Sequence, residues 1–230
     1  MKKVSVIINS VDNDSGQLKE AIASYAQQSK EDIEVEIIVS TIDGDPAIEI
    51  AKKMGCIVVT AKKPGIFEQI NRAVKKVTGD YVCYASGNDV ALPDKLLMEV
   101  TALETEKKLV CFSSFFKTDE NLDNRKLALF HAYDYKKHLT GNFVSDCSMM
   151  TRDVLDKYAP FNPKFKNHAY YDFWLRVAEG EGRNMFVYNP QPTWLYRQSS
   201  NSSHLLRKKD PKKVEENNLN RQKMLATHGV

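Results

Sequence analysis

Short β-branched runs alternate with segments of helical periodicity over the first 85 residues. Strand-like runs lie at residues 4–8, 35–39, 56–60 and 81–85. Between them, apolar residues recur at helical spacing from Leu18, from Pro46 to Met54 and from Ile66 to Val77. Strands separated by helices pair in parallel through right-handed crossovers, and helices then cover both faces of the sheet. The pattern therefore predicts an α/β fold with a Rossmann-like, mostly parallel sheet.

The second half of the chain has a less regular pattern. We expect helices at residues 93–103, 152–158, 169–178 and 212–226, and strands at residues 109–116, 143–150, 185–188 and 193–197. Residues 118–134 are polar and predict a loop or a short hairpin. Gly79 is expected to end the third helix, and Pro93 to occupy the first position of the next one. No repeat or linker divides the chain, so we predict a single domain over residues 1–230.

Charge and composition argue against several kinds of protein. Lys and Arg (33) barely exceed Asp and Glu (30), so the formal charge of +3 argues against a nucleic-acid partner. No apolar run approaches the roughly 18 residues that span a bilayer, and the opening apolar stretch is too short for a signal peptide. The four cysteines form no Cys-x-x-Cys pair, which favours reduced thiols and a cytoplasmic location.

Ligands of α/β sheets bind at the carboxyl ends of the strands, which directs attention to the loop after residues 81–85. This strand ends in Ser86-Gly87-Asn88-Asp89, a small polar loop with one carboxylate. A carboxylate at such an edge suits Mg²⁺ or Mn²⁺, which complete their coordination with phosphate oxygens and water. Asp89 is therefore a candidate metal ligand. These residues alone leave equally open that Asp89 caps a turn or the helix that follows.

Residues 79–94 resemble the strand and acidic motif of family 2 glycosyltransferases, in which Gly-Asp-Tyr precedes Asp-x-Asp-Asp and an apolar-Pro-Asp ending. Other segments resemble further motifs of that family in the same order along the chain. They are residues 4–8, 36–39, 65–73, 161–163, 172–176 and 194–197. Each match is weak alone, but the ordered set from Val4 to His204 is specific.

The resemblance implies a GT-A-type fold with a smaller acceptor-side subregion. Residues 1–92 would bind the nucleotide sugar and residues 93–204 the acceptor, and residues 205–230 would form a basic, helical tail. The implied reaction moves a sugar from a UDP-, GDP- or dTDP-linked donor to a hydroxyl of a glycan or a lipid-linked acceptor, with inversion. One Mn²⁺ or Mg²⁺ ion would assist, because a cation stabilises charge on the leaving diphosphate.

The resemblance also implies roles for individual residues. Asp172 would be the catalytic base that takes the proton of the acceptor hydroxyl, and it would face Asp89 across one cleft. An ion pair with Arg176 at i,i+4 is the alternative for Asp172. The cation would be held by Asp89 and His204, and the acceptor would contact Asp146 and Tyr171. The nucleotide sugar would contact Asn9, Ser10, Asp12, Thr41, Asn71, Arg72, Ser86, Gly87, Asn88 and Arg197.

Several positions depart from the pattern of the family. Ser86 and Asn88 stand where the acidic motif has carboxylates, so we expect the cation to be bound weakly. Thr41 stands where the family has the aspartate that contacts the nucleotide base, and Tyr171 where an acidic residue precedes the catalytic aspartate. A protein that binds nucleotide sugars but has lost catalysis is therefore the alternative function.

Two further interpretations rest on basic residues. A nucleotidyltransferase would need a Gly-rich, basic loop after the first strand, but this loop has a single glycine, Gly16, and no basic residue before Lys19. We rank that function last. Near the end of the chain, Arg207, Lys208 and Lys209 precede the pair at residues 212–213. This run indicates either peripheral contact with the inner membrane surface or a solvated tail.

Overall fold

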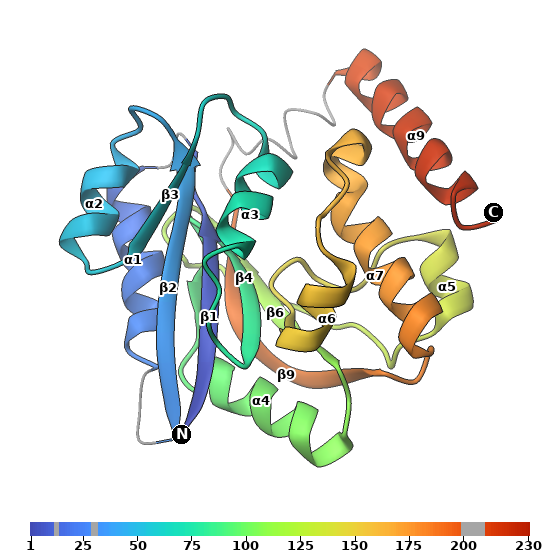
Figure 1. The fold of residues 1–230 in the computed structure, drawn as a ribbon, viewed down its shortest axis with the longest axis horizontal. Helices are drawn as coiled ribbons and strands as arrows, with labels where there is room; N and C mark the ends of the chain where they lie inside the picture. Colours follow the sequence, from blue (N-terminus) through green and yellow to red (C-terminus); the bar gives the residue numbers. More distant parts are fainter. Residues whose placement is uncertain (12–13, 29–31, 199–209) are drawn as a thin grey trace.

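The computed structural model describes residues 1–11, 14–28, 32–198 and 210–230 (Figure 1). Its first part alternates strands and helices. The elements are β1 (Lys2–Asn9), α1 (Ser15–Ala26), β2 (Ile33–Ile42), α2 (Ala47–Lys53), β3 (Ile57–Ala61), α3 (Ile66–Val74) and β4 (Tyr81–Ser86). The alternation predicted for the first 85 residues is confirmed.

The second part adds strands to the sheet and helices to both of its faces. The elements are β5 (Val90–Ala91), α4 (Lys95–Glu106), β6 (Val110–Thr118), β7 (Lys126–Ala128), α5 (Tyr135–Thr140), β8 (Met149–Thr151), α6 (Arg152–Tyr158), the 3-10 helix η1 (Pro163–His168), α7 (Ala169–Glu181), β9 (Phe186–Arg197) and α9 (Pro211–Ala226). The helix predicted at residues 152–158 has the same bounds in the structure, and α9 begins one residue before the predicted tail helix.

The described strands form a sheet in the order β3-β2-β1-β4-β8-β6-β9-β5, with β7 paired to β6. β3, β2, β1 and β4 are parallel, whereas β8 is antiparallel to β4 and β6. The register places Asn9, at the end of β1, beside Ser86, at the end of β4. Two residues predicted to bind the donor therefore meet at the carboxyl edge of the sheet.

Helices cover both faces of this sheet (Figure 1). Val4, Val6 and Ile8 of β1 pack into a core shared with α1 and α4. Ile7 packs into a second core, on the side of α3 and α7. Such alternation within an apolar run is typical of a parallel strand that is buried on both faces. The architecture confirms the predicted α/β class with its mostly parallel, Rossmann-like half.

Two local predictions are wrong. Gly79 does not end α3, which stops at Val74; instead, a Cβ at residue 79 would lie 2.7 Å from the backbone nitrogen of Ser5. Gly79 therefore permits close contact with β1. Pro93 precedes α4 rather than opening it, because the helix begins at Lys95 with Asp94 as its N-cap in a left-handed conformation.

Three other segments differ from expectation in ways that affect the site. Only residues 149–150 of the predicted strand 143–150 are in the sheet, as part of β8, and residues 141–148 form no helix or strand. The predicted strands 185–188 and 193–197 are parts of β9. The polar stretch at residues 118–134 contains β7, which forms a hairpin with β6. None of the described helices has the length and apolar character needed to cross a membrane.

Candidate active site

A cleft of about 560 Å³ opens at the carboxyl ends of β1 and β4. Asn9 and Ser86 line it from those strand ends, and Asp89 lines it from the loop after β4. Asp146 contributes from the irregular segment of residues 141–148. This is the edge where α/β sheets bind ligands, and the structure brings these four predicted site residues together there.

Asp89 and Asp146 are the charged side chains that line the cleft in the described part of the chain. Burial raises the pKa of Asp89 to about 7; the backbone N–H and charge of Arg197 oppose this shift, and the Asp146 carboxylate adds to it. The Asp146 side chain is exposed at the mouth of the cleft, and partial desolvation by the surrounding protein atoms raises its pKa to about 6. Both carboxylates therefore exchange protons near neutral pH.

The backbone of β9 holds the Asp89 carboxylate in place. Its Oδ1 atom accepts the backbone N–H of Arg197 at 2.9 Å. The buried Arg197 guanidinium donates to the carbonyl of Asn88 at 2.8 Å. It also donates to the Glu120 carbonyl and pairs with the Glu20 carboxylate. The prediction that Arg197 binds the nucleotide sugar is therefore corrected, because its guanidinium is used to brace the loop that carries Asp89.

Some polar atoms of the cleft residues have unused hydrogen-bonding capacity. Asn9 Oδ1, Tyr84 OH and Trp194 Nε1 are buried and have no hydrogen-bond partner among the described residues. Nearly all buried polar groups in proteins are paired, and each unpaired one costs about 1–3 kcal/mol. The amide oxygen accepts, the indole donates and the hydroxyl does either. The cleft therefore contains groups suited to a polar ligand.

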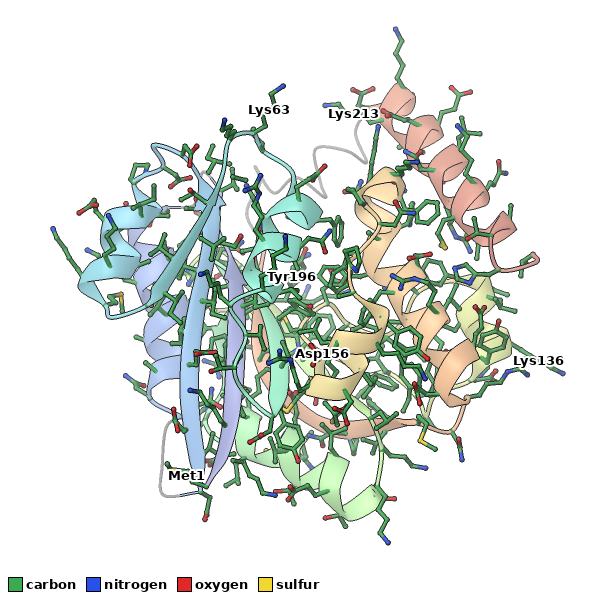
Figure 2. The ribbon with its side chains drawn as sticks, in the orientation of Figure 1. Met1, Lys63, Lys136, Asp156, Tyr196 and Lys213 are labelled. Carbon is green, nitrogen blue, oxygen red and sulfur yellow. The ribbon has the colours of Figure 1, made fainter. Side chains whose placement is uncertain are left out.

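Aromatic residues of β6 and β9 form another part of the cleft lining. Phe115 stacks on Trp194 with ring centroids 4.4 Å apart, and Tyr196 packs edge-on against both rings. Figure 2 shows Tyr196 near the middle of the molecule. Sequence reasoning missed this wall, because aromatic residues at strand spacing look the same in a core and in a binding site. Trp174, by contrast, is fully buried in the core.

Asp172 does not face this cleft. Its Oδ2 atom pairs with Arg176 Nε at 2.9 Å, and its Oδ1 atom lies 3.2 Å from His228 Nε2. These residues line a separate hollow between α7 and the C-terminal segment. Tyr170 of the same helix lines the cleft instead. The prediction that Asp172 lies across one cleft from Asp89 is wrong, because two residues along a helix turn a side chain by about 200°.

The loop after β4 is tied to the end of β1. The Gly87 N–H donates to the Asn9 carbonyl at 2.9 Å, and the Ser86 hydroxyl donates to Asn88 Oδ1. Of the three predicted loop residues, Ser86 lines the cleft, while Gly87 and Asn88 shape the loop.

Ser10 and Thr41 lie deeper in the protein than the sequence suggested. They are fully buried beyond the end of β1 and near the end of β2, and neither lines the cleft. Their contact with the nucleotide sugar therefore stays a prediction. The buried Thr41 hydroxyl has no hydrogen-bond partner among the described residues.

Three more predicted site residues have other contacts. The Asn71 amide makes two hydrogen bonds of 2.8 Å with the backbone of Phe161, which tie α3 to the loop before η1. Arg72 is exposed and lies outside the cleft lining. Tyr171 is buried, donates its hydroxyl to the His138 carbonyl and stacks on that ring. The predictions for Asn71 and Tyr171 are therefore corrected, because their polar groups are used within the fold, whereas the binding role of Arg72 stays a prediction. Asp12 and His204 lie outside the described residues.

The residues of the cleft fit a hard divalent cation better than a soft one. Asp89 and Asp146 supply carboxylate oxygens, and Asn9 Oδ1 supplies a neutral oxygen. Mg²⁺ and Mn²⁺ are held by one or two carboxylates together with phosphate oxygens and water. The described residues contain no group of three or more His, Cys, Asp or Glu side chains arranged around a common point. The donor set is therefore small.

Comparison with solved structures identifies the fold as the GT-A type. The chain is similar to S. aureus TarS 1-349 in complex with UDP, with a TM-score of 0.69 and 16% identity over 98% of this chain and 64% of that one. It is also similar to glucosyl-3-phosphoglycerate synthase from Mycobacterium tuberculosis in complex with Mn²⁺, UDP and glucosyl-3-phosphoglycerate. That likeness has a TM-score of 0.66 and 16% identity over 98% of this chain and 78% of that one.

The fold and its acidic cleft thus define the class of GT-A glycosyltransferase-like proteins. The chain belongs to glycosyl transferase family 2, whose model matches residues 5–159. It is 26% identical over 193 residues to a Methanocaldococcus jannaschii protein named "Uncharacterized glycosyltransferase MJ1057". That match covers 77% of this chain and 65% of the relative, so the chain spans just under two thirds of the relative's length.

Proposed function

We propose that this protein transfers a glycosyl group from a nucleotide-sugar donor to an acceptor hydroxyl, with inversion and with help from a divalent cation. Its membership of glycosyl transferase family 2 supports this class of reaction. The observation that carries the proposal is the cleft at the carboxyl ends of β1 and β4, whose charged lining in the described residues consists of Asp89 and Asp146. The transfer needs a base that takes the proton of the acceptor alcohol. It also needs a positive charge near the diphosphate leaving group, which a cation held by a carboxylate would supply.

Asp146 is our candidate for the base. The acceptor oxygen forms a bond to the anomeric carbon while the bond from that carbon to the diphosphate oxygen breaks. The electron pair leaves with the diphosphate, and the proton of the acceptor passes to Asp146. A pKa of about 6 leaves this carboxylate largely ionised at pH 7.5 yet basic enough to accept a proton. Its position in the cleft supports Asp146 over Asp172, whose carboxylate is paired elsewhere.

Asp89, with Asn9 as a neutral ligand, would hold a Mn²⁺ or Mg²⁺ ion, which leaves Asp146 free to act as the base. A diphosphate entering a cleft whose charged lining is acidic meets repulsion, and a bound cation reverses the sign of that interaction. When bound, the cation supplies charge stabilisation to the leaving diphosphate. The complex of the M. tuberculosis synthase with Mn²⁺ and UDP supports a cation in a fold of this type.

We propose UDP as the nucleotide to test first, ahead of GDP and dTDP. The TarS and glucosyl-3-phosphoglycerate synthase structures contain UDP. In this chain the donor would contact Asn9 and Ser86 at the strand ends. The unpaired Asn9 Oδ1 accepts a hydrogen bond, so it suits an N–H or O–H group of a nucleoside.

The aromatic wall of Phe115, Trp194 and Tyr196 suits the apolar face of an acceptor sugar ring. This supports a glycan or a lipid-linked sugar as the acceptor class. For a lipid-linked acceptor, the exposed Lys212 and Lys213 of α9 would add attraction to an anionic leaflet. Sedimentation with anionic and neutral vesicles distinguishes such a peripheral cytoplasmic-face protein from one that acts away from membranes.

The test is a donor-hydrolysis and thermal-shift screen of UDP-, GDP- and dTDP-sugars with and without Mn²⁺. A ligand that binds the native state raises Tm. We expect one donor to raise Tm more with Mn²⁺ than without it and to release nucleoside diphosphate slowly. Asp146→Asn is expected to abolish that release while keeping the Tm shift, and Asp89→Asn to lose the Mn²⁺ dependence. Failure of every donor to bind would overturn the proposal.

A nucleotide-sugar-binding protein without catalysis is the second candidate. It is favoured by the amide of Asn88 and the hydroxyl of Ser86, which stand where the family resemblance places carboxylates. In the same screen this candidate predicts donor-dependent Tm shifts with no diphosphate released. The Asp146→Asn variant would then match the wild type in every measurement.

A further inference from the structure

Behind the cleft lies an ion pair that has no access to solvent. Lys95 and Glu99, one turn apart on α4, both have fully buried side chains, and Lys95 Nζ lies 2.6 Å from Glu99 Oε1. Burial alone would lower the pKa of Lys95, but the Glu99 carboxylate outweighs burial and raises it above its ordinary value. The lysine is therefore charged at neutral pH.

This ion pair connects three elements that meet at the cleft. Lys95 Nζ also donates to the backbone carbonyl of Cys147 at 2.9 Å. Glu99 Oε1 accepts hydrogen bonds from Ser113 of β6 at 2.8 Å and from Thr193 of β9 at 3.0 Å. Cys147 lines the cleft next to Asp146, and Thr193 precedes the cleft residue at position 194.

The Cys147 carbonyl is an important anchor for the segment that carries Asp146. Residues 141–148 form no helix or strand. The side-chain bonds of Ser145 and Ser148 are local to the segment. Asn142 Oδ1 also lies 3.0 Å from His138 Nε2 of α5, and the Cys83 thiol of β4 makes a longer contact of 3.8 Å with the Cys147 carbonyl. The bond from Lys95, reaching across 52 positions of sequence, ties the segment to the rigid helix α4. Fixing the neighbouring carbonyl restricts where the Asp146 carboxylate lies.

Stability alone does not explain the buried Lys95–Glu99 ion pair. Taking two charges out of water costs more than their attraction returns unless every lone pair is satisfied. Here Glu99 Oε2 is buried with no hydrogen-bond partner among the described residues. A well-packed apolar pair of similar volume often makes a protein equally or more stable. What apolar side chains lack is a donor for the Cys147 carbonyl.

We infer that the buried Lys95–Glu99 pair positions Asp146 in the cleft, through the hydrogen bond from Lys95 to the Cys147 carbonyl. Lys95 and Glu99 are positioning residues, since neither lines the cleft. The inference rests on the proposed function for its importance to catalysis. The placement of Asp146 can, however, be measured without any donor or acceptor.

The test compares the wild type with the double variant Lys95→Met/Glu99→Leu by native-state hydrogen exchange of the full-length protein. We expect the amides of residues 145–148 to exchange about tenfold faster in the double variant, because the segment loses its hydrogen bond to α4. Amides of β1 and β4, measured in the same sample, show whether the rest of the sheet is unchanged.

Ser113→Ala is the matched control, because it removes a hydrogen bond to Glu99 without touching Cys147. We expect it to leave the hydrogen exchange of residues 145–148 unchanged. Should the double variant not fold, the isosteric Glu99→Gln gives the same measurement, with a smaller effect in the same direction. A folded variant with wild-type exchange in this segment would overturn the inference. Absence of sugar transfer by the wild type would contradict the proposed function and leave this measurement valid.

Discussion

Tyr170 and Asp172 stand two residues apart on α7, yet the tyrosine lines the cleft and the aspartate pairs with Arg176 and His228 in a separate hollow. The helix is buried on nearly all sides, so neighbouring positions contact different parts of the protein. The only ionisable group that α7 offers to the cleft is therefore the Tyr170 phenol, whose pKa burial raises well above its ordinary value. In the reaction proposed above, the base is therefore Asp146 and not a residue of α7.

Replacing Asp172 by Asn should weaken the fold and spare the cleft. The variant leaves Arg176 and His228 without their buried anionic partner, which we expect to cost about 1–3 kcal/mol of unfolding free energy. Donor binding and any turnover per folded molecule should stay at the wild-type level. Urea unfolding and donor hydrolysis measure the two effects. Loss of turnover with unchanged stability would instead restore Asp172 as the catalytic base.

Cation binding should strengthen as pH rises from 5.5 to 7.5. Asp89 has a pKa of about 7, and a metal ligand must be deprotonated. The raised pKa of Asp89 also means that the folded protein holds a proton that the unfolded chain releases. Its contribution to stability therefore falls between about pH 4 and pH 7. We expect the Tm gain from Mn²⁺ to be larger at pH 7.5 than at pH 5.5, by differential scanning fluorimetry. The double variant Asp89→Asn/Asp146→Asn should show no such pH dependence.

The C-terminal helix should be held more firmly below neutral pH than above it. His228 lies 3.0 Å from Glu179 and 3.2 Å from Asp172. Burial alone would lower the pKa of His228, but these two carboxylates outweigh burial and raise it. A raised folded-state pKa stabilises the fold fully below the unfolded value of about 6.5, and this stabilisation is lost as pH rises through the folded-state pKa.

Hydrogen exchange of α9, corrected for its intrinsic pH dependence, measures this effect at pH 6 and pH 9. We expect protection to fall at the higher pH in the wild type. In the His228→Gln variant, protection of α9 should be weak at both pH values. The exposed His131→Gln serves as the control and should behave like the wild type. Equal protection at both pH values in the wild type would show that His228 does not hold the helix.

Asn71 should matter for stability and not for nucleotide binding. Asn71→Ala leaves the N–H and carbonyl of Phe161 without their 2.8 Å partners, which we expect to cost about 1–3 kcal/mol. Its neighbour Arg72 is exposed, so Arg72→Ala should change stability by less than about 0.5 kcal/mol. Chemical denaturation and UDP titration check both variants. A weakened UDP affinity in folded Asn71→Ala would return this residue to the binding site.

Gly79 should not tolerate even one added methyl group. A Cβ there would lie 2.7 Å from the Ser5 nitrogen and 2.8 Å from the Lys3 carbonyl, and backbone atoms cannot move aside as a side chain can. We expect Gly79→Ala to destabilise the protein by about 1–3 kcal/mol. Gly141→Ala is the matched control, because its Cβ would enter open space. Equal melting temperatures for the two variants would contradict this account of Gly79.

The sequence by itself determined the parallel half of the fold and the location of the cleft. The β-branched runs of β1 and β4 are buried on both faces, and polar residues follow where each strand ends. Because strand ends of a parallel sheet meet at one edge, Asn9, Ser86 and Asp89 were predictable as neighbours. Asp146 was predictable as a cleft residue only through the family resemblance, since the segment around it has no regular structure.

The tertiary structure alone decided which side chains of the second half reach the cleft. Helix α7 is apolar on almost every side, so its sequence period marks no single buried face, and Asp172 was assigned to the wrong side. Arg197 and Asn71 also carry polar groups that suit a ligand, but contacts from distant segments use those groups within the fold. Such long-range pairing depends on how the elements pack, so it cannot be predicted from the local sequence pattern.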